Sequence, residues 1–154
     1  MDTLEMLRKK YEELGEEIER LKTEKENKVW KPKYGDSFWV LSHTGGVVQA
    51  RWINGNLEDD MYAIGNVFKT KEEAKFRGEQ LKVEAELRRF ARPFKSDSEN
   101  YTLQYWQDDD ILDITCFELL QCGNVYFPSR KIAQQAIDTV GAERIKKYYF
   151  GVED

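Results

Sequence analysis

The sequence predicts an α+β protein with an N-terminal coiled-coil-like helix followed by two pseudo-repeated β-β-β-α units with antiparallel sheets. Three observations predict this. Apolar residues recur at spacings of three and four near the N-terminus, two β-prone hairpin patterns follow, and a Gly-Asn-Val-aromatic motif begins at Gly65 and again at Gly123. We therefore expect a helical arm over residues 1–28, a first unit over 29–94 and a second unit over 95–154.

The N-terminal arm is predicted to carry one narrow apolar seam. Its a and d positions over three heptads are Leu4, Leu7, Tyr11, Leu14, Ile18 and Leu21. Glu17 and Lys22 occupy a g position and the following e position, where they can pair between parallel helices. An isolated helix of this length is marginal in water, so the seam needs a partner. We favour self-association into a dimer or trimer; the alternative is docking of the seam on the long helix of the first unit.

The first unit is expected to begin with a boundary segment and a hairpin. Pro32 disfavours the α region in the residue before it, so the arm cannot continue through it. The predicted strands of this unit are Ser37–Ser42, Val47–Ile53 and Met61–Ile64, with a loop over residues 54–60 before the third strand.

A long helix is expected to close the first unit. Thr70 and Glu73 have the spacing of a capping box, and the helix is predicted to run to about Arg92. Two apolar stripes lie on opposite faces. The small-residue stripe is Ala74, Gly78, Leu81 and Ala85, and the large-residue stripe is Phe76, Val83, Leu87, Phe90 and Phe94. We expect the small face to contact a sheet and the large face to contact another helix or subunit; an ordinary one-sided helix is the alternative.

The second unit repeats this order in a shorter form. Its predicted strands are Tyr101–Trp106, Ile111–Leu120 and Val125–Phe127. Ser129 is the expected N-cap of a helix that ends at Gly141, and a short further helix is expected over residues 142–147. The halves should form either two three-stranded sheets or one continuous sheet.

Composition excludes several classes of protein. The net charge of −5 argues against a general nucleic-acid binder, which is usually basic. No apolar run approaches the roughly 20 residues of a membrane helix, and the charged N-terminus lacks the apolar region of a signal peptide. We expect no membrane partner and a cytoplasmic location.

No catalytic constellation is evident. The single His43 and the two cysteines, Cys116 and Cys122, give neither a disulfide framework nor a convincing zinc site. Phosphate loops and nucleophile–base motifs are also missing from the sequence. We expect no enzyme activity, no catalytic residues, no metal and no cofactor.

Three groups of residues are candidates for binding. In addition to the helical seam, we expect four aromatic residues to lie on a protein-binding surface: Trp39, Trp52, Tyr105 and Trp106. Carboxylates expected in acidic patches are Glu58, Asp59, Asp60, Asp108, Asp109 and Asp110. A basic row at seven-residue spacing, which could contact phosphates, is Lys75, Lys82 and Arg89.

Several segments resemble a module of small accessory proteins from phages and prophages of Gram-positive bacteria. They are Trp30-Lys31-Pro32, Tyr34-Gly35-Asp36, the stretch GNVFKTKEEA at 65–74 and the ending RIKKYYFG at 144–151. The resemblance covers most of the chain after residue 29. It implies an accessory phage protein that interacts with the host, a group that includes inhibitors of bacterial defence such as anti-CRISPR proteins. It assigns no chemistry to particular residues.

The leading functional hypothesis is a non-enzymatic binding protein with a host protein as partner. If that target is a nuclease, the acidic patches could occupy its nucleic-acid groove. One alternative is binding or sequestration of nucleic acid or a nucleotide signal, with aromatic residues stacking on bases and the basic row neutralising phosphates. A second alternative is an assembly scaffold.

Overall fold

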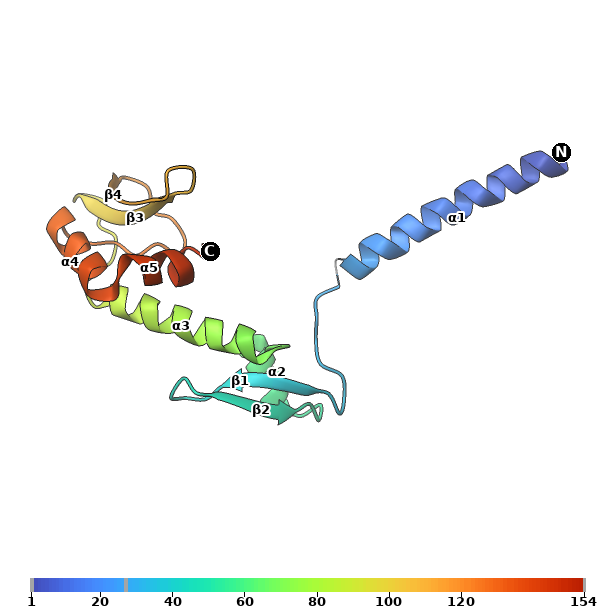
Figure 1. Ribbon diagram of the computed structural model, residues 1–154, viewed down its shortest axis with the longest axis horizontal. Coiled ribbons are helices and arrows are strands. Elements are labelled where there is room, and N and C mark those ends of the chain that lie inside the picture. Colours follow the sequence, from blue (N-terminus) through green and yellow to red (C-terminus); the bar gives the residue numbers. More distant parts are fainter. Residues whose placement is uncertain (1, 27, 154) are drawn as a thin grey trace. The chain divides into compact units, whose positions relative to one another are not determined.

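The computed structural model describes residues 2–26 and 28–153, which form an α+β protein (Figure 1). The chain divides into two compact units, residues 1–33 and 34–154. The first unit contains the N-terminal helix. The second contains both β-hairpins and the helices that pack on them, so the predicted halves on either side of residue 94 belong to one compact unit.

The N-terminal helix α1 spans Thr3–Glu26 and agrees with the predicted arm, of which Met1 and Asn27 lie outside the described residues. None of its side chains is buried. Lys22 pairs with Glu19 at 2.7 Å, one helical turn away. Such exposed pairs add only a few tenths of a kcal/mol, roughly 0.2–0.5 each. The helix therefore has little to stabilise it apart from contacts that its apolar side chains can make.

The first hairpin confirms the predicted pairing of β1 (Ser37–Leu41) with β2 (Val47–Arg51). The Asn66 side chain continues this pairing beyond β1. Its Oδ1 accepts the Leu41 N–H at 2.7 Å, and its Nδ2 donates to the Leu41 carbonyl at 2.9 Å. Two residues later, Phe68 forms a single antiparallel bridge with Trp39.

The predicted loop over 54–60 and third strand Met61–Ile64 are wrong, because residues Asn56–Ala63 form the helix α2. Asn54 adopts a positive φ of 57°, which turns the chain out of the hairpin before the helix starts. Met61 and Tyr62 then pack on the cluster around Trp52, whose ring is 6.3 Å from that of Tyr62. This packing outweighs the β propensity of the local run.

Helix α3 (Lys71–Arg88) begins with the predicted capping box. The Thr70 hydroxyl accepts from the Glu73 N–H at 3.2 Å, and the Glu73 carboxylate accepts from the Thr70 N–H at 3.4 Å. The helix ends before Arg92, at Arg88. Because Arg92 donates its backbone N–H to the Tyr126 carbonyl, the chain there already follows the second half of the unit.

The buried side of α3 changes along its length. In the first half Ala74 and Gly78 are buried, and a Cβ atom at Gly78 would lie 3.3 Å from Leu41 Cδ2. In the second half Val83 and Leu87 are buried in the larger core. Figure 1 shows this arrangement, with the β1–β2 hairpin at one end of α3 and two later helices, α4 (Arg130–Val140) and α5 (Ala142–Arg144), at the other. Each predicted stripe is thus buried over part of the helix.

The second hairpin pairs β3 (Asn100–Trp106) with β4 (Ile111–Phe117). Beyond it, Phe127 makes one antiparallel bridge with Tyr101. The expected three-stranded or continuous sheets are wrong, since the described residues form two separate two-stranded sheets. The third segments, near Phe68 and Phe127, turn directly into helix caps after one bridge, which leaves no length for a ladder.

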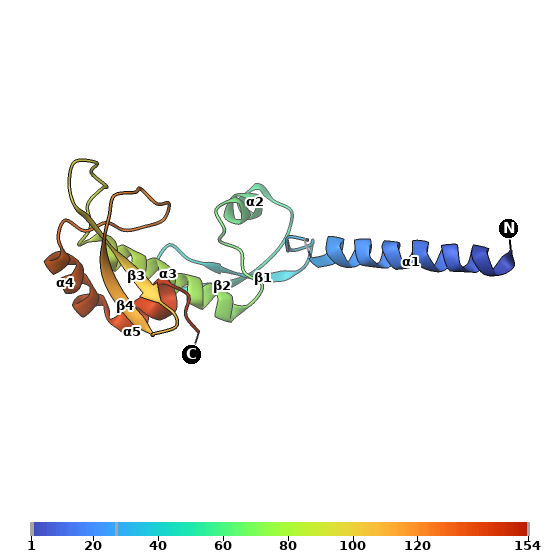
Figure 2. The same cartoon turned by 90° about the horizontal axis from the view of Figure 1, so that it is seen from above.

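Three short helices complete the unit beside the second hairpin (Figure 2). Helix α4 (Arg130–Val140) is capped by Ser129, as predicted, and ends at Gly141, where φ is 99°. A glycine suits this position because other residues are strained at positive φ. Helix α5 (Ala142–Arg144) runs directly into the π-helix η1 (Ile145–Tyr149).

Two hydrophobic cores lie within residues 34–154. The smaller core is formed by Phe38, Val40 and Trp52. The larger core joins the second half of α3, the second hairpin, α4 and η1: Val83, Leu87, Leu103, Ile114, Val125, Phe127, Ala133, Ala136, Ile137, Val140 and Ile145. α3 contributes buried residues at both ends and so links the two halves of the unit.

Candidate functional site

The apolar seam of α1 is exposed along its whole length. The exposed fractions of Leu4, Leu7, Leu14 and Leu21 are 57%, 60%, 61% and 51%, and those of Ile18 and Tyr11 are 50% and 81%. Scattered exposed apolar residues are ordinary on a protein surface. Six of them along one helix face make a continuous stripe, which is the arrangement that a partner helix covers in a coiled coil.

The large-residue face of α3, the alternative docking site for the seam, is occupied within residues 34–154. Val83 and Leu87 are fully buried in the larger core. Phe76 packs against Tyr148, with ring centroids 5.2 Å apart. These contacts bury Val83 and Leu87 within residues 34–154, whereas Phe76 stays 36% exposed.

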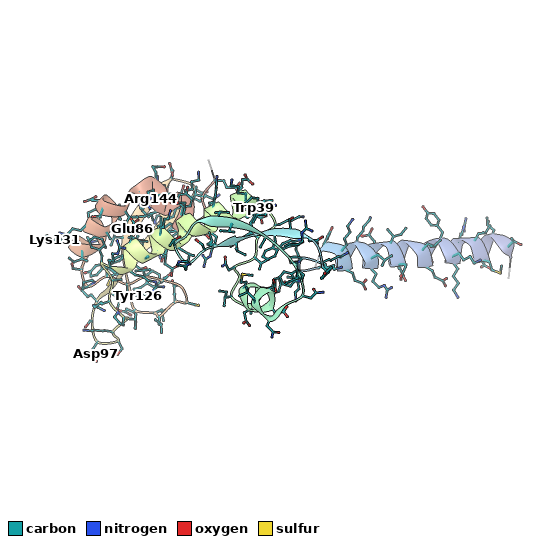
Figure 3. All side chains as sticks on the ribbon, turned by 90° about the horizontal axis from the view of Figure 1, so that it is seen from below. Trp39, Glu86, Asp97, Tyr126, Lys131 and Arg144 are labelled. Atoms are coloured by element: carbon teal, nitrogen blue, oxygen red, sulfur yellow. The ribbon has the colours of Figure 1, made fainter. Side chains whose placement is uncertain are left out.

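The predicted surface aromatics do not share one surface. The prediction for Trp52 is wrong, because its side chain is 1% exposed and its indole N–H donates to Asn54 Oδ1 at 2.7 Å. Trp39, labelled in Figure 3, is half-buried. Lys71 Nζ lies 5.5 Å from the centroid of its ring. Tyr105 is half-buried and Trp106 is exposed, and both line a shallow depression of about 400 Å³ on the second hairpin.

The first acidic patch is smaller than predicted. Glu58 is only 8% exposed, in the first turn of α2, so it does not belong to a surface patch. Asp59 and Asp60 are exposed on the same helix. The patch therefore presents two carboxylates rather than three.

The second acidic patch is also smaller than predicted, because Asp110 forms a hydrogen bond and an ion pair within the protein. It accepts a hydrogen bond from the Tyr105 hydroxyl at 2.7 Å and pairs with Lys146 Nζ at 3.2 Å. The hydrogen bond from Tyr105 and the Lys146 ammonium lower the pKa of Asp110. Asp108 and Asp109 remain exposed. Across residues 2–26 and 28–153, no three metal-ligating side chains come together.

The predicted basic row is divided by the fold. Lys75 and Lys82 line a groove of about 530 Å³, whereas Arg89 lies outside it. The groove is bordered by the turn of the first hairpin, by α3 and by η1, which contributes Lys147 and Tyr148. Lys147 could not be assigned to this site from local spacing, because only tertiary packing brings it to α3.

The groove combines cations with an aromatic wall. Lys147 Nζ lies 5.6 Å from the centroid of the Tyr148 ring, which in turn contacts Phe76. Lys82 pairs with Glu79 at 2.7 Å. Neither Lys75 nor Lys147 forms an ion pair with any described residue. Two ammonium groups in the groove are therefore available to an anionic ligand.

Two further findings bear on the candidate sites. Within the described part of the chain, no helix has both the length and the apolar character that crossing a bilayer requires. Comparison with known proteins finds no matching family model, no matching curated protein and no matching solved structure.

Proposed function

We propose that the protein is a non-enzymatic binding protein that acts through protein–protein association, and that its α1 seam forms a coiled coil with another copy of the chain. The observation that carries this proposal is the exposure of all six seam residues on a helix without buried side chains. Covering apolar surface is favourable by about 25 cal/mol per Å². A helix of this length gains most of its stability from such packing.

A parallel arrangement is favoured by the charged residues beside the seam. Lys22 follows Glu17 at the spacing of a g–e′ pair, which is attractive between parallel helices. In the single chain, Glu17 pairs with Arg20 and Lys22 pairs with Glu19. These exposed pairs are weak, so they can exchange for pairs between helices at little cost. A dimer or a trimer satisfies the same contacts.

We also propose that the two hairpin-plus-helix segments are pseudo-repeats. Each has a two-stranded hairpin, one further bridge to its first strand, and a hydroxyl-capped helix. The bridges are Trp39–Phe68 and Tyr101–Phe127, and the caps are Thr70 and Ser129. The helix α2 occurs in the first segment only.

The partner we propose is a host protein in a phage or prophage setting, as the sequence resemblance implies. Inhibition of a host defence nuclease is the specific role that fits exposed carboxylates, here Asp59, Asp60, Asp108 and Asp109. Reversing these four charges should abolish protection of a phage in a plaque assay. Protection that survives the reversal would exclude these carboxylates from the mechanism. If the protein forms an oligomer but binds no host protein, an assembly scaffold becomes the better hypothesis.

The association itself is tested by the molecular mass in solution. We expect the full-length chain to be a dimer or trimer and a chain that starts at Val29 to be a monomer. Sedimentation equilibrium over a range of concentrations gives both values. A full-length chain that stays monomeric at high concentration would contradict self-association through α1.

A further inference from the structure

We propose that the groove between the first hairpin, α3 and η1 binds a nucleotide unit, meaning a phosphate group together with its base. The site is defined by Lys75, Lys82, Lys147, Phe76, Tyr148 and Gly78. It is independent of the α1 seam, because every one of these residues belongs to the unit of residues 34–154.

The phosphate would be held by the lysines. They converge from α3 and η1, and two of them, Lys75 and Lys147, have no carboxylate partner among the described residues. The third lysine, Lys82, already forms an ion pair with Glu79. Hydrogen bonds between an ammonium group and a phosphate are charge-assisted, and they are stronger than neutral ones. In a chain of net charge −5, this local excess of cations favours an anionic ligand specifically at the groove.

The base would be held by the aromatic wall. The centroids of the Phe76 and Tyr148 rings are 5.2 Å apart, and Phe76 is 36% exposed. An aromatic side chain beside a basic groove provides a stacking surface for any base. Lys147 already lies over the Tyr148 ring, so a ligand that bridges the two would contact a cation and an aromatic ring together.

Gly78 lets α3 and the first hairpin approach closely beside the groove, since it is buried and a Cβ atom there would lie 3.3 Å from Leu41 Cδ2 and 3.7 Å from the Gly45 carbonyl oxygen. The volume of about 530 Å³ lies within the range of small-ligand pockets, roughly 300–1,000 Å³. Glu72 and Glu79, which also line the groove, can accept hydrogen bonds from ribose hydroxyls or base amino groups.

A nucleotide unit can come from a free nucleotide or from a single-stranded nucleic acid. We would titrate the full-length protein with ADP, with a short oligodeoxythymidine and with polyglutamate, and follow binding by calorimetry. Saturable binding of ADP identifies a free nucleotide as the source. Binding of the oligonucleotide alone identifies single-stranded nucleic acid, and its affinity should then fall roughly threefold between 50 and 200 mM salt for the one phosphate contacted.

Charge reversals locate the site. Lys75→Glu and Lys147→Glu should each weaken binding of the active probe roughly tenfold or more, because each replaces a phosphate contact by a repulsion. The matched control is Arg89→Glu, which makes the same charge change on the same helix outside the groove, and it should change affinity less than about twofold. Lys75 is exposed on α3, so its substitution tests the site without disturbing the core.

The aromatic contribution is tested by Tyr148→Leu, which should weaken ADP or oligonucleotide binding roughly tenfold while leaving inorganic phosphate binding unchanged. If that variant unfolds, the two lysine variants still decide the question. The proposal is overturned if neither nucleotide probe binds, if polyglutamate binds as tightly as they do, or if Arg89→Glu weakens binding as much as Lys75→Glu.

Discussion

Arg144 of α5 donates two hydrogen bonds to the carboxylate of Glu86 on α3, at 2.9 and 3.1 Å (Figure 3). The same guanidinium donates to the Val140 carbonyl, at the end of α4. The Arg144 hydrogen bond is the main reason that the pKa of Glu86 lies below its ordinary value, and Glu86 in turn raises the pKa of Arg144. This two-pronged contact joins three helices of the larger core.

Glu86→Gln should lower the free energy of unfolding by about 1 kcal/mol at neutral pH, because the side chains are only partly exposed and the geometry is bidentate. The matched control is Glu84→Gln, which breaks an exposed pair with Arg88 within the same helix and should cost about 0.3–0.5 kcal/mol. Urea unfolding of the three proteins measures both differences. Equal losses would mean that the Arg144 contact adds nothing beyond an ordinary surface pair.

The Glu86 contribution should also depend on pH in a defined direction. Because its pKa is lower in the folded protein than the ordinary 4.5, the stabilisation is present above that value and is lost as the pH falls through the folded pKa. The stability difference between the wild type and Glu86→Gln should therefore shrink below about pH 4.5. A difference that stays constant down to pH 3 would contradict this assignment.

Leu14→Glu should convert the proposed oligomer to a monomer. Leu14 is at the centre of the seam and is 61% exposed in the single chain, so the substitution costs the monomer little. In a coiled coil it would place a charge between apolar side chains, which is expensive. Glu16→Lys, on the opposite side of the helix, is the control and should keep the oligomer. Sedimentation equilibrium distinguishes the two variants.

Trp52→Ala should destabilise the protein by about 3–5 kcal/mol, the usual cost of removing a large buried aromatic side chain. Trp106→Ala should change stability by no more than about 0.5 kcal/mol, since Trp106 is 54% exposed. Thermal or urea unfolding measures both. A small effect at Trp52 would contradict its place in the smaller core.

Thr70→Ala should cost about 1 kcal/mol, because the α3 N-cap loses the hydroxyl that accepts the Glu73 N–H. Thr70→Ser keeps that oxygen and should retain most of the stability. Urea unfolding of the pair separates the loss of the cap from a general effect of substitution. If the serine variant loses as much as the alanine variant, the hydroxyl is not the cause.

Local patterns in the sequence predicted much of the fold. The two hairpins, the caps at Thr70 and Ser129 and the stop at Gly141 all depend on residues within a few positions of each other. Helix α2 was missed because Met61 and Tyr62 fit a short strand equally well until they contact Trp52. The prediction of third strands was also wrong, because the local sequence does not distinguish a single β-bridge from a longer strand pairing.

The candidate sites show the same limit. The seam of α1 was predictable, since its spacing lies within one helix. The basic row predicted only part of the groove. Helical periodicity places Arg89 in line with Lys75 and Lys82, but it does not show which other elements pack beside each residue. Lys147 joins the groove only after η1 packs against α3. Burial of Trp52 likewise depends on α2, which the sequence did not reveal.

The change of buried side along α3 has a consequence for how the unit opens. A two-stranded sheet is marginal alone, so the first hairpin depends on the smaller core and on Ala74 and Gly78. If that hairpin detaches, Val83 and Leu87 stay covered. Amide hydrogen exchange in the first turns of α3 should then follow a local, low-energy opening, whereas exchange in its last turns requires unfolding of the larger core. A single helix would thus report two opening events of different free energy.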